Sequence, residues 1–339
     1  MPAIWTEPEH ARAEYRRAGR ALRQQVIPVA DDVINNWRSS HSYPLNQFYM
    51  VLKSRARKVN SNSYVSQRLK RLNSIHAKLV REPAMQLVTM QDIPGCRAIL
   101  PTLADARNLV SLYETMDIPH EFDHSKDYVG RPKSSGYRSY HLIYRYKSDV
   151  RTAYEDMRVE IRIRIALQHA WATALETIDL FTRQALKSSQ GSQDWERFFV
   201  LMSSAIARKE KCPEVSGSPS GKQLVEEIRH LNESLGVIER LRSYKRFREI
   251  LNYDEQKKHA YVVLKTSIEQ GEAVIHTWGF DDTELERAQE FYYLQEAKQD
   301  GEVVLVAASR ARNIRRAFPN FFADTDVFIR ELQEVVGAR

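Results

Sequence analysis

Between Lys126 and His141 the sequence reads K-D-Y-V-G-R-P-K-S-S-G-Y-R-S-Y-H, which combines residue types that bind nucleotides. Its basic side chains are able to neutralise phosphates and its tyrosines offer flat faces to bases. These are Lys126, Arg131, Lys133, Arg138, Tyr128, Tyr137 and Tyr140. Gly130 and Gly136 allow the backbone to approach a ligand closely. The stretch indicates a nucleotide site, although an edge hairpin with solvated charges explains the same residues equally well.

A second basic stretch lies upstream. From Lys53 to Arg81 there are nine Lys or Arg residues and no Asp or Glu. In a helix, Lys70, Ser74 and Lys78 would share one face at intervals of four residues. Like charges at this spacing repel each other, so the face suits a bound polyphosphate. The alternative is a solvated helix face.

Two carboxylates accompany these basic stretches. Asp92 leads an apolar, strand-like run that ends at Leu100. Downstream, the segment 157–165 alternates apolar and charged residues, which predicts a half-buried strand with Glu160, Arg162 and Arg164 on its polar face. A carboxylate between arginines is most often a structural ion pair. Beside a nucleoside triphosphate it is also a candidate Mg²⁺ ligand or proton acceptor.

Composition favours a chain that functions in the cytoplasm with a polyanionic partner. Of the 339 residues 42% are hydrophobic, no apolar run is long enough to span a membrane, and the start of the chain does not resemble a secretion signal. Cys96 and Cys212 lie far apart and form no C-x-x-C pair, which argues against a disulfide framework or a zinc knuckle. A net charge of +7 and a pI near 9.2 favour polyanions.

The order of elements predicts an α+β fold. Helices are expected over 9–26, around 29–37 and from Leu45 onward, followed by strand–helix alternation and long helices over 168–186 and 195–209. The segment 213–222 is rich in Pro, Gly and Ser, as in a linker. We expect a domain over 1–212, a linker and connecting helix over 213–255, and a small β-β-α-β-α module over 256–339.

Four ordered motifs across residues 68–164 resemble those of the RelA/SpoT alarmone synthetase family. They are Arg68-x-Lys70-x-x-x-Ser74-x-x-x-Lys78, Asp92-Ile-x-Gly-x-Arg97, Lys126-Asp-Tyr with Pro132-Lys133 and Gly136-Tyr137-Arg138-Ser139-x-His141, and Val159-Glu160-Ile-x-Ile-Arg164. The family transfers the β,γ-pyrophosphate of ATP to a ribose 3′-hydroxyl, and the resemblance implies a mixed-sheet, nucleotidyltransferase-like core flanked by helices.

The resemblance also implies roles for individual residues. Arg68 and Arg97 would sandwich the adenine, while Lys70, Ser74 and Lys78 would hold the ATP phosphates. Asp92 and Glu160 would serve Mg²⁺, and Glu160 would activate the 3′-hydroxyl. Tyr137 would stack on the acceptor base, with the further acceptor-binding side chains being Lys126, Lys133, Arg138 and His141.

The chain departs from the family pattern in two respects. Arg162 and Ile165 stand where the family usually has Gln and Thr, which leaves the acceptor open. No His-Asp pair of a hydrolase precedes the synthetase motifs. The tail is similar to the pseudo-zinc-finger antitoxin module of fused toxic small alarmone synthetases of the CapRel type. By that resemblance, Phe318 and Phe321 would occlude the ATP site, whereas packing inside the module explains them equally well.

Three functions follow as hypotheses. The first is a toxin that pyrophosphorylates the 3′-CCA end of tRNA, is inhibited by its own C-terminal module and is released by a phage protein. The second is a synthetase that makes (p)ppGpp from ATP and GDP or GTP. The third is an inactive RNA-binding or phage-sensing protein, which the presence of both Asp92 and Glu160 disfavours.

Overall fold

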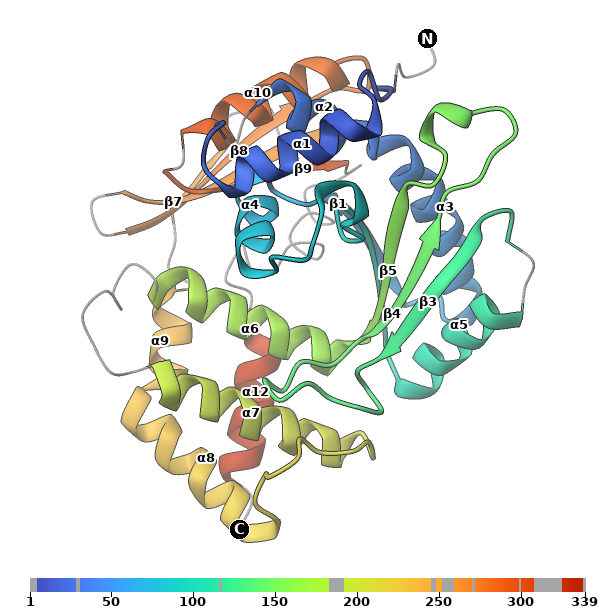
Figure 1. Ribbon diagram of the computed structural model, residues 1–339. Helices are drawn as coiled ribbons and strands as arrows, with labels where there is room; N and C mark the ends of the chain where they lie inside the picture. Colours follow the sequence, from blue (N-terminus) through green and yellow to red (C-terminus); the bar gives the residue numbers. More distant parts are fainter. Residues whose placement is uncertain are drawn as a thin grey trace.

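The computed structural model describes residues 5–28, 31–115, 118–182, 192–244, 248–251, 259–269, 272–298, 300–307 and 325–337. Its first sheet has the strand order β1-β2-β5-β4-β3. The strands are β1 (Tyr64–Leu69), β2 (Pro94–Leu100), β3 (Glu121–Asp127), β4 (Tyr140–Arg145) and β5 (Arg158–Ile165). Within the described residues of this first sheet, β2 and β5 are the one pair that runs parallel. This mixed sheet, surrounded by helices, confirms the predicted α+β class (Figure 1).

Helices pack on both faces of this sheet. On one face lie α3 (Ser42–Val59) and α5 (Leu103–Thr115), and on the other α6 (Ala166–Thr182) begins directly after β5 (Figure 1). The alternation of β2 and β5 buries Ala98, Ile161 and Ile163 in the core under α3 and α5, and leaves the opposite face to polar side chains. The remaining N-terminal elements are α1 (Arg12–Arg23), α2 (Asp32–Ser40), α4 (Leu72–Arg81), η1 (Leu87–Thr89) and η2 (Thr152–Tyr154).

The prediction that Lys70, Ser74 and Lys78 share one helical face is wrong for Lys70. Lys70 lies between β1 and α4, and its backbone amide donates to the Ile93 carbonyl at 2.7 Å, which prolongs the pairing of β1 with the segment before β2. Extended backbone forms here in place of a helix because β1 pairs with β2 along its whole length. Ser74 and Lys78 do share one face of α4, one turn apart.

The buried residues of a second apolar core come from helices. It contains α6, α7 (Ser192–Lys209), α8 (Gly221–Leu235), α9 (Val237–Tyr244) and the last helix, α12 (Asp326–Gly337). From α12, Phe328 and Leu332 are fully buried among these helices, Phe328 against Phe198 and Phe199. The last helix was expected in the C-terminal module, but its apolar stripe packs on this cluster.

The second sheet has the order β6-β8-β7-β9. Its strands are β6 (Arg248–Leu251), β7 (Tyr261–Glu269), β8 (Glu272–Phe280) and β9 (Glu302–Ala307), and α10 (Leu285–Ala297) packs on it through Ala288 and Tyr292. The predicted order β-β-α-β is present as β7, β8, α10 and β9, with β6 added in parallel to β8. Phe318 and Phe321 lie outside the described residues. Among the described helices, none is long and apolar enough to cross a membrane.

Candidate active site

The first sheet aligns polar residues from all five strands in one row. Following the register from β1 to β3, the row contains Ser66, Arg97, Arg162, His141 and Lys126. Residues that are neighbours in register project from the same face of a sheet. The row contains residues of three of the four predicted motifs, and Arg68 of the remaining motif lies on the same face, two residues from Ser66. The segment 126–141 does form the hairpin of β3 and β4 that its alternative interpretation required, and this hairpin carries predicted site residues.

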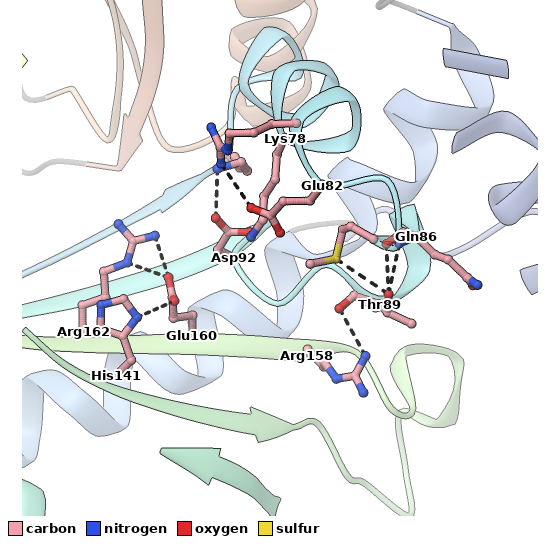
Figure 2. Close-up of polar contacts among 12 residues, drawn as sticks. Lys78, Glu82, Gln86, Thr89, Asp92, His141, Arg158, Glu160 and Arg162 are labelled. Atoms are coloured by element: carbon pink, nitrogen blue, oxygen red, sulfur yellow. Dashed lines mark hydrogen bonds and ion pairs between the residues drawn. The ribbon is translucent and has the colours of Figure 1, made fainter. Parts of the chain in front are cut away.

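Asp92, just before β2, joins the first and second motifs. Its Oδ2 accepts a hydrogen bond from Lys70 Nζ at 2.9 Å, and its Oδ1 accepts one from Lys78 Nζ at 2.8 Å (Figure 2). Burial acts to raise the pKa of Asp92, but the two ammonium groups outweigh it and lower the value to about 2. The two lysines converge on one carboxylate, although they lie on different elements.

Glu160 is the second carboxylate and is only 6% exposed. His141 Nδ1 lies 2.8 Å from its Oε1, and Arg162 Nε donates to its Oε2 at 2.6 Å, so the two side chains flank the carboxylate (Figure 2). Burial opposes ionisation, but Arg162 and His141 favour it and hold the pKa of Glu160 well below its usual value. Because an ionised carboxylate only accepts hydrogen bonds, the His141 proton lies on Nδ1.

Tyr137 extends this network toward the loop between β3 and β4. Its hydroxyl lies 2.8 Å from His141 Nε2 and accepts a hydrogen bond from Arg164 at 2.7 Å. Burial acts to raise the pKa of Tyr137, but Arg164 and Arg162 outweigh it and lower the value to about 7. The Lys133 ammonium lies 5.3 Å from the centre of the Tyr137 ring. Tyrosine, histidine and glutamate thus form one chain of contacts.

The loop that carries Tyr137 is held against the helices. Gly136 has φ +86°, and a Cβ there would come within 2.9 Å of Ser203 Cβ, so both its conformation and its packing require glycine. Arg138 is buried, and it donates to the Ser203 hydroxyl at 3.0 Å and to the Val129 carbonyl at 3.2 Å. These contacts give Arg138 a structural role in holding the loop, and its role in acceptor binding stays a prediction.

The other predicted residues surround this centre. Arg68 is the register partner of Gly95, which is in turn next to Glu160 on β5. Ser74 is half-buried on α4, whereas Lys126 and Lys133 are exposed.

Sequence reasoning assigned no site role to Gly95, Arg162 or Arg164. The predicted alternation of 157–165 had already placed both arginines on the same face as Glu160, and this pattern was the signal for them. Gly95 gave none. The nearest atom to a Cβ built on Gly95 is the Arg68 carbonyl oxygen at 3.8 Å, so its missing side chain leaves open space between Arg68 and Glu160. A ligand on this face has room to approach the sheet there.

The pair of Asp92 and Glu160 suits Mg²⁺ better than a metal that is coordinated by protein side chains alone. No group of three metal-ligating side chains occurs in the part of the chain that the structure describes. Asp92 and Glu160 are close enough that the charge of Glu160 acts to raise the pKa of Asp92. Mg²⁺ is commonly bound by one or two carboxylates together with substrate phosphates, which this pair fits.

Comparison with known proteins agrees with the four motifs. Residues 67–178 match the protein-family model described as "Region found in RelA / SpoT proteins". The chain is 35% identical over 112 residues to GTP pyrophosphokinase YjbM and 31% identical over 123 residues to GTP pyrophosphokinase YwaC, both from Bacillus subtilis (strain 168). These matches cover 32% and 34% of this chain, and 53% and 56% of the relatives, so the chain spans only about half their length.

Among solved structures, the chain is similar to small alarmone synthetase 1 from Bacillus subtilis bound to its product pppGpp. The TM-score is 0.44 with 22% identity, over 50% of this chain and 89% of that one. A GTP pyrophosphokinase family protein from Streptococcus pneumoniae gives a TM-score of 0.42 with 20% identity, over 50% of this chain and 85% of the other.

Proposed function

We propose that the protein is an ATP pyrophosphotransferase of the RelA/SpoT type. The observation that carries this proposal is the convergence of Asp92, Glu160 and Tyr137 with the cations of all four motifs on one sheet face, inside the region that matches the family. In the reaction, a ribose 3′-oxygen of the acceptor bonds to the β-phosphorus of ATP. The bond from that phosphorus to the α,β-bridging oxygen breaks, and AMP leaves.

Each group then has a role consistent with its position. Lys70 and Lys78 neutralise the phosphates, Ser74 helps to orient them, and Arg68 and Arg97 flank the adenine. Glu160 lies beside the acceptor and takes the hydroxyl proton, while Tyr137 stacks on the acceptor base. Asp92 and Glu160 would hold Mg²⁺, which would supply positive charge to the phosphates when bound. The low pKa of Glu160 keeps the carboxylate ionised at neutral pH.

The proposed acceptor is the 3′-CCA end of tRNA, with GDP or GTP as the second candidate. A module that restrains the enzyme suits a toxin, and the basic net charge suits tRNA. The guanosine alternative is favoured by the relatives, both named GTP pyrophosphokinase. Incubation with γ-labelled ATP and either deacylated tRNA or GDP separates them. Label that appears only in the guanosine product rejects tRNA as the acceptor. If an opened variant labels neither acceptor, the proposed transferase activity is rejected.

Autoinhibition by the C-terminal module is supported by its contacts with α2 and α4. Arg38 on α2 is buried, donates to the Tyr292 hydroxyl at 2.6 Å, and lies 3.9 Å from Glu296. Its guanidinium also lies 4.7 Å from the centre of the Tyr292 ring. Glu296 accepts from the backbone amide of Leu72 at 2.8 Å, in the first turn of α4. The module thus holds the helix that carries Ser74 and Lys78.

Release requires a partner that favours the open state strongly. Moving a two-state protein from 1:99 to 99:1 takes about 5.5 kcal/mol of differential binding, which a protein surface supplies more readily than a small ion. We therefore propose a protein trigger, such as a phage component, that binds the C-terminal module. Titration of purified candidates against transfer activity tests this, and activation by none of them, in a chain that opened variants show to be competent, rejects it.

A further inference from the structure

The face of the first sheet that carries Glu160 continues to a small cavity beside α1. Arg158 lies two residues before Glu160 on β5, and its register partner on β4 is Arg145. Because side chains two residues apart on a strand project from the same face, both arginines extend the face of the candidate active site. Arg158 also donates to the Thr89 carbonyl at 3.2 Å (Figure 2). The cavity has a volume of about 130 Å³, and its walls include Arg12, Arg16, Thr89, Arg145, Asp156 and Arg158.

The carboxylates near this cavity are already engaged. Asp123 contacts two of the arginines at once, lying 2.7 Å from Arg145 and 3.5 Å from Arg158. Asp156 is paired with Lys147 at 2.8 Å. Neither carboxylate is therefore available to balance the arginines that α1 contributes to the cavity.

Donors of three arginines remain unsatisfied around the cavity. Arg12 donates to the backbone carbonyl of Asp156 at 3.4 Å, and in the described part of the chain neither Arg12 nor Arg16 forms an ion pair. Arg158 Nε is buried and has no hydrogen-bond partner among the residues that the structure describes. Like charges that converge in this way repel each other unless an anion lies between them. A phosphate offers several acceptor oxygens to guanidinium groups at once, so it suits this cavity.

The positive charge continues along α1 beyond the cavity. Arg12, Arg16 and Arg20 recur every four residues and are all exposed, so they form an arginine row on one face of the helix. Four residues advance an α-helix by about 6 Å, which makes the row about 12 Å long. A mononucleotide would occupy one end of this row, whereas a polynucleotide presents a phosphate at each successive nucleotide. The row therefore favours a nucleic-acid strand.

We propose that the cavity and the arginine row bind backbone phosphates of an RNA acceptor, upstream of its 3′-terminal nucleotide. This inference rests on the proposed function, because it takes the terminal ribose to lie beside Glu160. Along β5, Arg158 lies about 7 Å beyond Glu160, a distance comparable to the span of one nucleotide. The described residues that line the cavity include none from the second sheet, α10 or α12, so a strand reaches the cavity with the C-terminal module in place.

Equilibrium binding to the full-length protein at several salt concentrations tests the proposal. The probes are a short fluorescent single-stranded RNA that ends in CCA, a duplex DNA of the same length, and GDP. The test variant carries Arg12→Gln together with Arg16→Gln. Arg17→Gln is the matched control, because Arg17 is exposed on the same helix and lies outside the row. Thermal unfolding verifies that each variant folds.

The double variant should bind the RNA at least about tenfold more weakly at low salt. Each phosphate contact on a single strand contributes about 0.7 to the slope of log K against log salt concentration, so the slope should become shallower by about 1.4. GDP affinity should not change, and Arg17→Gln should bind the RNA within about twofold of the original protein.

Three results would overturn the proposal. They are equal RNA affinity in the double variant and the original protein, an equal loss of RNA and GDP affinity, which would indicate a mononucleotide phosphate site, and no preference for the RNA over the duplex DNA. A chain that binds the RNA through these arginines but, in an opened variant, transfers no pyrophosphate rejects the proposed function and leaves the RNA site intact.

Discussion

Replacing Tyr292 by Phe should loosen the C-terminal module without disturbing its core. The substitution keeps the ring that packs on Val263 and Ala288 and removes the hydroxyl that accepts from Arg38 at 2.6 Å. A hydrogen bond to a charged group contributes about 1.5 to 3 kcal/mol, and each 1.4 kcal/mol is about tenfold in an equilibrium constant. The ratio of closed to open protein should therefore fall by about 10- to 150-fold.

Hydrogen exchange at the Leu72 amide reports this opening directly, because this amide donates a hydrogen bond to Glu296 of the module. In Tyr292→Phe the Leu72 amide and its neighbours in the first turn of α4 should exchange faster by a similar factor. The amides between β7 and β9 should keep their protection, since the sheet itself is unchanged. Tyr261→Phe, on β7, is the control in the same module.

Unchanged exchange at α4 in Tyr292→Phe would refute the proposed contact. Faster exchange at α4 without any gain in pyrophosphate transfer would refute autoinhibition while leaving the contact in place. Deleting residues 250–339 is a less informative test, because it also removes α12 and exposes the apolar surface of α6 and α7 that Phe328 and Leu332 cover. A truncated chain that aggregates would say nothing about inhibition.

Three further predictions concern the site. Gly95→Val should weaken ATP binding by at least about tenfold with little change in melting temperature, because the added side chain fills open space on the site face. Gly95→Ala should have a smaller effect. Equal ATP affinity in both variants would contradict the assignment of this space to ATP. Glu160→Gln should reduce pyrophosphate transfer by at least about 100-fold. It should also lower the melting temperature, because Arg162 loses its charged partner. Retained activity would exclude Glu160 as the proton acceptor. Tyrosinate absorbance should reveal one group titrating near pH 7, absent in Tyr137→Phe and shifted upward in Arg164→Met. Because the pKa of Tyr137 is lower in the folded protein than in the unfolded chain, its ionisation adds to the free energy of unfolding. This contribution is complete above pH 10 and is lost as the pH falls through 7. Identical titrations in all three proteins would refute the assignment of this group to Tyr137.

Local periodicity predicted much of the site. The alternation of 157–165 placed Glu160, Arg162 and Arg164 on one face, and all three meet there. It failed at Lys70, where pairing of β1 with β2 overrode a helical spacing that Ser74 and Lys78 keep. It did not predict the role of Arg38, because the partners of this residue in the C-terminal module lie about 250 positions away in sequence, and no local pattern encodes such a contact.

The chain enters the second sheet from α9 and returns from it to α12, and both helices belong to the same cluster. The module that we propose to be inhibitory is thus fastened at two points to the helical cluster. Once opened, it remains at a high effective concentration next to α2 and α4, so reclosure needs no diffusional encounter. An activating partner would consequently have to stay bound for as long as activity is needed, and its departure would reset the enzyme within the same molecule.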